Sequence, residues 1–125
     1  MTVLDASAIL GLILGEPRAR SVLDHLDGAA VSAVNHAEVV GKLTSVGMPS
    51  PIVVEAVDRL DLDIVSFTEV HAVITGELRS LTSAMGLSIG DRACLGTALD
   101  MGATVVTLDR AWADLDLGIP IIVLT

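Results

Sequence analysis

The sequence has very few cysteine, aromatic and basic residues. Cys94 is the only cysteine among 125 residues, which excludes a disulfide framework or a metal cluster built from cysteines. Tyrosine is absent, and Phe67 and Trp112 are the only other aromatic residues, so a row of aromatic side chains for stacking bases is not expected. Sixteen acidic residues outnumber seven basic ones and give a net charge of −9. This balance argues against a broad basic face for nucleic acid.

Long apolar runs and nucleotide-binding motifs are also missing. The longest apolar stretch, Ala8 to Gly15, is too short to cross a bilayer. The first residues have no basic segment and already include Asp5, so we expect no secretion signal, no membrane contact and a cytoplasmic location. Neither G-x-G-x-x-G nor a Walker motif occurs, which leaves dinucleotide or NTP binding without support. Residues 1–125 are enough for a single domain, and their 52% apolar content could also cover a subunit interface.

Short β-branched runs alternate with longer helical patterns along the chain. The predicted strands are 2–5, 29–32, 62–67, 104–108 and 119–124. The predicted helices are 8–14, 17–27, 32–47 or 35–47, one after Pro51 that ends near Leu60, one after the cap Thr68, 88–102, and a short turn at Trp112. The apolar face of the helix after Thr68 is predicted to comprise Val70, Val73, Ile74, Leu78 and Leu81. Apolar strands such as IIVL favour parallel strands covered on both faces. We therefore predict an α/β fold, a three-layer α/β/α sandwich with a central, mainly parallel five-stranded sheet.

Four acidic residues lie where the chain passes from one element to the next. Asp5 and Asp109 end predicted strands, Asp91 begins a helix in SIGDRA, and Glu38 lies one turn into a helix in NHAEVV. Because the loops after parallel strands meet at one edge of a sheet, we expect these four carboxylates to converge. Converging carboxylates repel each other unless a cation joins them. The pattern therefore predicts a divalent-metal site and hydrolysis of a phosphodiester.

Each of these acids could also have a purely structural role. Asp5 and Asp109 could cap the helices that follow them, and Asp91 matches a capping box with Ser88. Glu38 could be an ordinary residue on a helix surface. Local charge balance could account for the few bases that stand near the acids, namely Lys42, Arg92 and Arg110. The four acids together are the stronger signal, because the purely structural interpretation needs four separate coincidences.

Several polar residues stand close to the acids along the sequence. Ser7, Asn35 and Thr107 could orient the carboxylates or metal-bound water. Local hydrogen bonds to the backbone would account for them equally well. The histidines lack the spacing of metal ligands and are interpreted as surface residues or as satisfied partners, namely His25, His36 and His71.

The chain resembles a PIN domain, and specifically the VapC-type toxins of toxin–antitoxin modules. The resemblance rests on VLDASAIL, SAVNHAEV and LSIGDRACLGTALDMGATVVTLDRAW, and it spans essentially the whole sequence. It implies that Asp5, Glu38, Asp91 and Asp109 are the catalytic, metal-binding acids. It also implies that Ser7, Asn35 and Thr107 support them. The expected protein is a Mg²⁺- or Mn²⁺-dependent endoribonuclease with a PIN-like fold.

The resemblance also implies partners. Proteins of this type are usually homodimers, and a cognate VapB-type antitoxin holds them inactive by covering the active site. Expected products of RNA cleavage carry a 5′-phosphate and a 3′-hydroxyl. The helices between Asn35 and Leu60 could hold the dimer interface or could be ordinary core, through Val39, Val40, Leu43, Ile52, Val53 and Val57.

Two other functions stay open at this point. One is a receiver-like signalling domain, which is also a small α/β sheet with acids at the strand ends. A receiver normally needs a lysine after a late strand, and Lys42 is the only lysine here. The other is a catalytically inactive module that only binds an antitoxin.

Overall fold

Five parallel strands form a single sheet. The structure is a computed structural model that describes all of residues 1–125. Its strands are β1 (Thr2–Leu4), β2 (Ala30–Ser32), β3 (Asp63–Val65), β4 (Thr104–Thr107) and β5 (Ile121–Val123). They lie in the order β3-β2-β1-β4-β5, and every neighbouring pair is parallel. The prediction of a parallel five-stranded sheet is confirmed.

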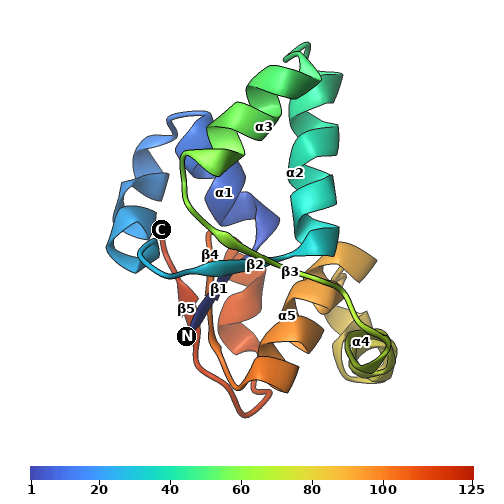
Figure 1. The fold of residues 1–125 in the computed structure, drawn as a ribbon. Helices are drawn as coiled ribbons and strands as arrows, with labels where there is room; N and C mark the ends of the chain where they lie inside the picture. The colour runs from blue at the N-terminus through green and yellow to red at the C-terminus, as the bar shows by residue number, and fades with distance from the viewer.

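Helices cover both faces of this sheet (Figure 1). One face carries α1 (Ala6–Ile13), η1 (Pro17–His25), α2 (Ala33–Ser45) and α3 (Ser50–Asp58). The other face carries α4 (Glu69–Thr82), α5 (Ile89–Met101) and η3 (Arg110–Asp114), and the short η2 (Ser83–Met85) follows α4. The helix predicted at 17–27 is a 3₁₀ helix rather than an α-helix. None of the helices combines the length and apolar character that crossing a bilayer requires.

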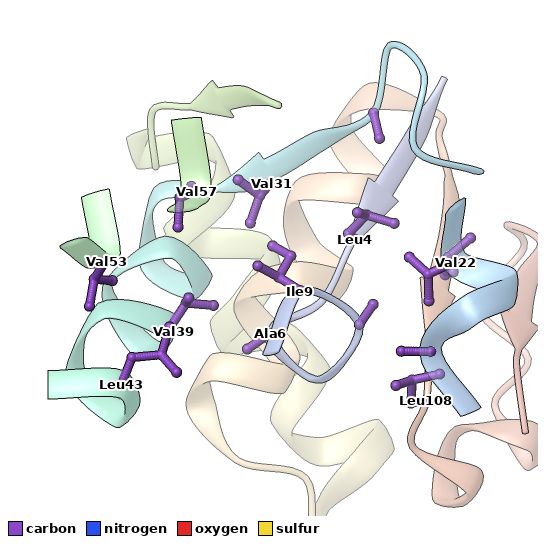
Figure 2. Packing of buried hydrophobic residues seen from close by; sticks show 14 residues of the cluster. Leu4, Ala6, Ile9, Val22, Val31, Val39, Leu43, Val53, Val57 and Leu108 are labelled. Carbon is purple, nitrogen blue, oxygen red and sulfur yellow. The ribbon is translucent and has the colours of Figure 1, made fainter. Parts of the chain in front are cut away.

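Alternate residues of the central strands belong to two separate hydrophobic cores. Leu4, Val31 and Val106 are fully buried on the side of α1 and α2, and Figure 2 shows Leu4 and Val31 beside Ile9 in this core. Their neighbours Val3 and Val105 are fully buried on the side of α5. Successive side chains of a strand point to opposite faces of the sheet. Because helices cover both faces, consecutive positions such as Val3 and Leu4 are both apolar.

The predicted apolar face of α4 is only partly correct, because Leu78 is buried and Ile74 packs against the core whereas the other three residues are exposed. Val70, Val73 and Leu81 are 55%, 57% and 70% exposed. The helix instead packs against α5 through a face that is mostly polar, formed by His71, Thr75, Leu78 and Thr82. These polar groups can be buried because they are hydrogen-bonded.

Local hydrogen bonds satisfy the buried histidine of that face. His71 Nδ1 accepts from the backbone N–H of Thr68 (3.2 Å), which leaves Nε2 to donate to Asp100 Oδ2 at 2.9 Å. The interpretation of His71 as a satisfied partner therefore agrees with its contacts.

Most of the apolar side chains of α2 and α3 turn inward, and Val39, Leu43, Val53 and Val57 belong to the core.

The sheet reverses its direction of growth between β1 and β4. The first three strands add in one direction from β1, and the last two add in the other. This order differs from the 2-1-3-4-5 order of receiver-like sheets, which contradicts the receiver-like alternative. In open parallel sheets, ligands bind beyond the carboxyl ends of the strands that flank such a reversal. Asp5 and Asp109 follow those two strands.

The close approach of α4 and α5 yields a test. A Cβ atom at Gly96 would lie 2.6 Å from Thr75 Oγ1 and 3.1 Å from Thr75 N. We expect Gly96→Ala to lower the free energy of unfolding by about 1–3 kcal/mol, because the two helices must separate. Gly41→Ala in α2 is the matched control, since no atom lies within 4 Å of its new Cβ, and it should stabilise the protein by up to about 1 kcal/mol. Urea unfolding followed by circular dichroism measures both, and equal effects of the two variants would contradict the proposed contact.

Candidate active site

Asp5 is a buried carboxylate at the point where the sheet reverses. It follows β1, caps the N-terminus of α1 and is only 4% exposed. Oδ1 accepts from the backbone N–H of Ala8 (3.0 Å) and from the Ser7 hydroxyl (2.7 Å). The Thr107 hydroxyl at the end of β4 donates to Oδ2 at 2.6 Å. Three donors thus hold one carboxylate, and Thr107 ties β1 to β4 through it.

Burial dominates the electrostatics of this carboxylate. The pKa of Asp5 is raised from 3.8 to about 6, mainly because burial removes the carboxylate from water, and the charge of Asp91 also contributes to the rise. The hydrogen bonds from Thr107, Ser7 and Ala8 work in the opposite direction. A buried charge needs a partner, and Asp5 forms no ion pair with any basic side chain. A bound cation would therefore offset the unfavourable burial of this charge.

Glu38 is held in place across two helices. Asn35 Nδ2 donates to Glu38 Oε1 at 2.8 Å and to the backbone oxygen of Gly90 at 2.9 Å. The space that a side chain at position 90 would take is filled by the Glu38 carboxylate, whose Cδ atom would lie 2.6 Å from a Cβ there. Gly90 and Asn35 together therefore position Glu38 beside the N-terminus of α5.

Asp91 completes a group of three acids. It is half-buried in the first turn of α5, where its carboxylate accepts from the backbone N–H of Ser88 at 2.9 Å. Cys94 lies one turn further along. Burial raises the pKa of the Cys94 thiol well above its usual value, and the charges of Asp5, Asp91 and Glu38 raise it further. The charges of three acids from three elements therefore act on one buried residue.

Asp109 lies on the adjoining loop after β4. Its carboxylate caps η3 by accepting from the backbone N–H of Ala111 at 3.0 Å, and its own backbone N–H donates to Thr107 Oγ1 at 3.0 Å. Thr107 therefore connects the backbone of Asp109 to the carboxylate of Asp5. The structure brings Asp5, Glu38 and Asp91 to one region and places Asp109 at its border.

The capping roles predicted for several of the acids are also realised. Asp5, Asp91 and Asp109 each accept a backbone hydrogen bond at a helix start. These local bonds hold the carboxylates in separate positions, and no group of three or more His, Cys, Asp or Glu side chains is clustered tightly enough to hold a metal ion. Local charge balance is not realised, because none of the bases predicted to neutralise the acids forms an ion pair with them, namely Lys42, Arg92 and Arg110.

The donor chemistry of the site fits a hard divalent cation. The four acids offer only carboxylate oxygens, and none of the four has a counter-charge. Asn35 Oδ1 adds a buried carbonyl oxygen that has no hydrogen-bond partner. Mg²⁺ and Mn²⁺ prefer such oxygen ligands, whereas zinc prefers nitrogen and sulfur.

Sequence reasoning missed Gly90. Its role comes from the space it leaves for a carboxylate that is 52 positions away in the chain, and SIGDRA alone indicates only a helix start. A glycine in the first turn of a helix, directly before a candidate acid, was the one signal in the sequence. It is weak, because glycine also occurs near helix starts where no side chain needs its space.

Comparisons with known proteins place the fold. A family model described as PIN domain matches residues 2–117. A VapBC2 complex from Rickettsia felis, solved with a DNA fragment from its promoter, contains a chain with a TM-score of 0.78 and 20% identity that covers 99% of this chain and 98% of its own. FitAcB from Neisseria gonorrhoeae matches at a TM-score of 0.73 and 24% identity, with coverages of 98% and 96%. A toxin–antitoxin complex from Klebsiella pneumoniae matches at 0.75 and 18%, covering 92% of both chains. No curated protein matches the sequence significantly.

The buried state of Asp5 predicts a stability that depends on pH. Its pKa is about 6 in the folded protein and 3.8 in the unfolded chain, so the folded state binds the proton more tightly. The stabilisation that the folded protein gains from the protonated Asp5 carboxyl is complete below pH 3.8 and is lost as the pH rises through about 6. At pH 7.5 in EDTA, Asp5→Asn should therefore be more stable than the wild type by up to about 3 kcal/mol.

Urea unfolding of both proteins between pH 4.5 and 7.5 measures this difference. Asp24→Asn is the matched control, because Asp24 is exposed on η1 and should leave the pH dependence unchanged. A constant difference between wild type and Asp5→Asn across this pH range would contradict the account of Asp5.

Proposed function

The chain belongs to the PIN domain family, and we propose that it is the ribonuclease toxin of a VapC-type toxin–antitoxin module, acting on cytoplasmic RNA. The observation that carries the proposal is Asp5, a buried carboxylate without a counter-ion at the reversal of a parallel sheet, with Glu38 and Asp91 beside it. The structural neighbours include VapBC complexes and a further toxin–antitoxin complex, which supports this type within the family.

We propose Mg²⁺ or Mn²⁺ as the cofactor, held by Asp5, Asp91, Glu38 and Asp109. A bound ion of this kind supplies charge neutralisation at the scissile phosphate and lowers the pKa of water. The proposal is supported by the all-oxygen donor set and by the absence of counter-charges among these acids.

The remaining roles follow from the hydrogen bonds of the site. Thr107 and Ser7 fix both oxygens of Asp5, so this carboxylate presents a constant geometry. Asn35 donates a hydrogen bond to one carboxylate oxygen of Glu38. The other oxygen is free to accept a proton from an attacking water. The two carboxylates thus have different tasks, because Asp5 is buried and immobilised whereas Glu38 is only half-buried.

Two partners belong to the proposal. A cognate VapB-type antitoxin would inhibit the enzyme by covering the acids, and a second copy of the chain would form a homodimer. The neighbouring structures support the first of these, since several are complexes with an antitoxin. The second rests on the resemblance to VapC-type toxins.

Loss of the Asp5 charge should abolish the activity. We expect Asp5→Asn to fold, because asparagine also caps helices, and to cleave no RNA in Mg²⁺ or Mn²⁺. Expression without antitoxin should arrest growth for wild type and for Asp24→Asn, but not for Asp5→Asn. Mapping of cut sites in total RNA should find 5′-phosphate ends. An undiminished rate in Asp5→Asn would remove Asp5 from the mechanism, and an inert wild type would favour the inactive binding module.

A side chain at position 90 should displace Glu38. We expect Gly90→Ala to lower the cleavage rate roughly 10–100-fold, as other losses of metal-site support do, because its Cβ needs the space of the Glu38 carboxylate. Gly41→Ala, which meets no neighbouring atom, should cleave like the wild type. If Gly90→Ala keeps full activity with an unchanged fold, the position of Glu38 is not important for cleavage.

A further inference from the structure

A hollow with two arginine side chains borders the candidate active site. Its lining consists of Ser7, Arg18, Leu108, Asp109 and Arg110. Ser7 also donates to the carboxylate of Asp5, and Asp109 is one of the four candidate acids, so the hollow adjoins the acid site. The motifs that indicated the acids gave no role to Arg18 or Arg110.

Tight packing brings the two arginines to one place although they are far apart in the sequence. A Cβ at Gly11 would lie 2.8 Å from both Ala19 Cβ and Leu108 Cδ1, which shows how closely α1, η1 and the loop after β4 approach each other. Arg18 Nη1 then reaches the backbone oxygen of Leu108 at 3.4 Å, and its Nε donates to Glu16 at 2.9 Å. These two bonds fix the guanidinium group against the loop that carries Arg110.

The hollow carries an arginine without an ion pair although the whole chain is acidic. Arg110 is exposed and forms no ion pair. The carboxylate of Asp109 is bonded to the N-terminus of η3. Arg18 already forms an ion pair with Glu16 at 2.9 Å, so the unpaired positive charge in this hollow is that of Arg110, in a protein with a net charge of −9. Two guanidinium groups in one hollow match the charge and the hydrogen-bonding geometry of a phosphate.

We propose that this hollow binds a backbone phosphate of the RNA substrate, next to the phosphate that is cleaved, with Arg110 and Arg18 as its ligands. The inference rests on the proposed ribonuclease function and adds a positioning site to it. Contacts to phosphates fix the register of a nucleic acid without reading its sequence. This site also accounts for how an acidic protein holds a polyanion, since attraction is needed only along the path of the strand.

The test measures RNA binding separately from cleavage. The Asp5→Asn protein in Mg²⁺ binds a fluorescein-labelled single-stranded RNA of mixed sequence, and anisotropy gives the affinity over a range of KCl concentrations. Each lost phosphate contact lowers the slope of log K against log salt by about 0.7 for a single strand. Adding Arg110→Gln should therefore lower the slope by about 0.7 and the affinity about fivefold at 0.1 M salt.

Matched variants separate charge from structure. Arg110→Lys keeps the charge and should restore the slope. Arg18→Lys keeps the charge but removes the planar guanidinium group, so it should keep most of the slope, because the slope depends on charge. Arg79→Gln is the control, because Arg79 is an exposed arginine of α4 without an ion pair that does not line the hollow. Thermal melting checks that every variant is folded.

Each outcome decides the proposal. A slope that falls with Arg110→Gln and not with Arg79→Gln supports it. Equal slopes for both variants, or no RNA binding, overturn it. Labelled polyglutamate, measured in the same way, is a second probe that offers carboxylates in place of phosphates. If Arg110→Gln weakens the binding of polyglutamate but not of RNA, the proposal is overturned, because the hollow would then hold a protein carboxylate. The wild-type cleavage assay distinguishes the two hypotheses, since an inert wild type whose Asp5→Asn form still shows the Arg110 effect would reject only the ribonuclease function.

Discussion

The structure depends on one buried carboxylate that joins the two halves of the sheet. Asp5 ends β1, caps α1 and accepts a hydrogen bond from Thr107 at the end of β4. The strands that it links are those at which the sheet changes its direction of growth. A charge in this position costs folding free energy because it is out of water and unpaired. Proteins retain such costs mainly at functional sites, where stability and activity compete.

Helix capping and the candidate chemistry use the same carboxylates. In a parallel α/β sheet, the helix that follows a strand begins at the edge where ligands bind. Asp5 and Asp109 each accept a backbone N–H at such a helix start, and Asp91 does so at the start of α5, which follows η2. At all three starts the helix dipole favours negative charge. Capping therefore helps the folded protein to keep these acids charged and fixed in position at this edge of the sheet. The structural and the functional role of each acid are compatible.

The net charge of the whole protein does not indicate which charges lie around its candidate active site. A net charge of −9 argues against a broad surface for RNA, whereas substrate contact requires only a few phosphates to be neutralised. The divalent ion would neutralise the cleaved phosphate, and the arginine-lined hollow would neutralise its neighbour. The fold places the hollow next to Asp5, because Ser7 lines the hollow and donates to the Asp5 carboxylate.

The sequence by itself determined the fold class, the element order and the four candidate acids, because strand periodicity, helix caps and the VLDASAIL and TLDRAW motifs are local signals. Only the tertiary structure decided which residues meet. It turned the polar face of α4 inward, since Gly96 lets α5 approach and hydrogen bonds satisfy His71, whereas hydrophobic spacing favoured Val70 and Val73. It also gave Gly90 and Arg18 their neighbours. Such contacts join residues far apart in the chain, and a local pattern holds no information about the space between two helices.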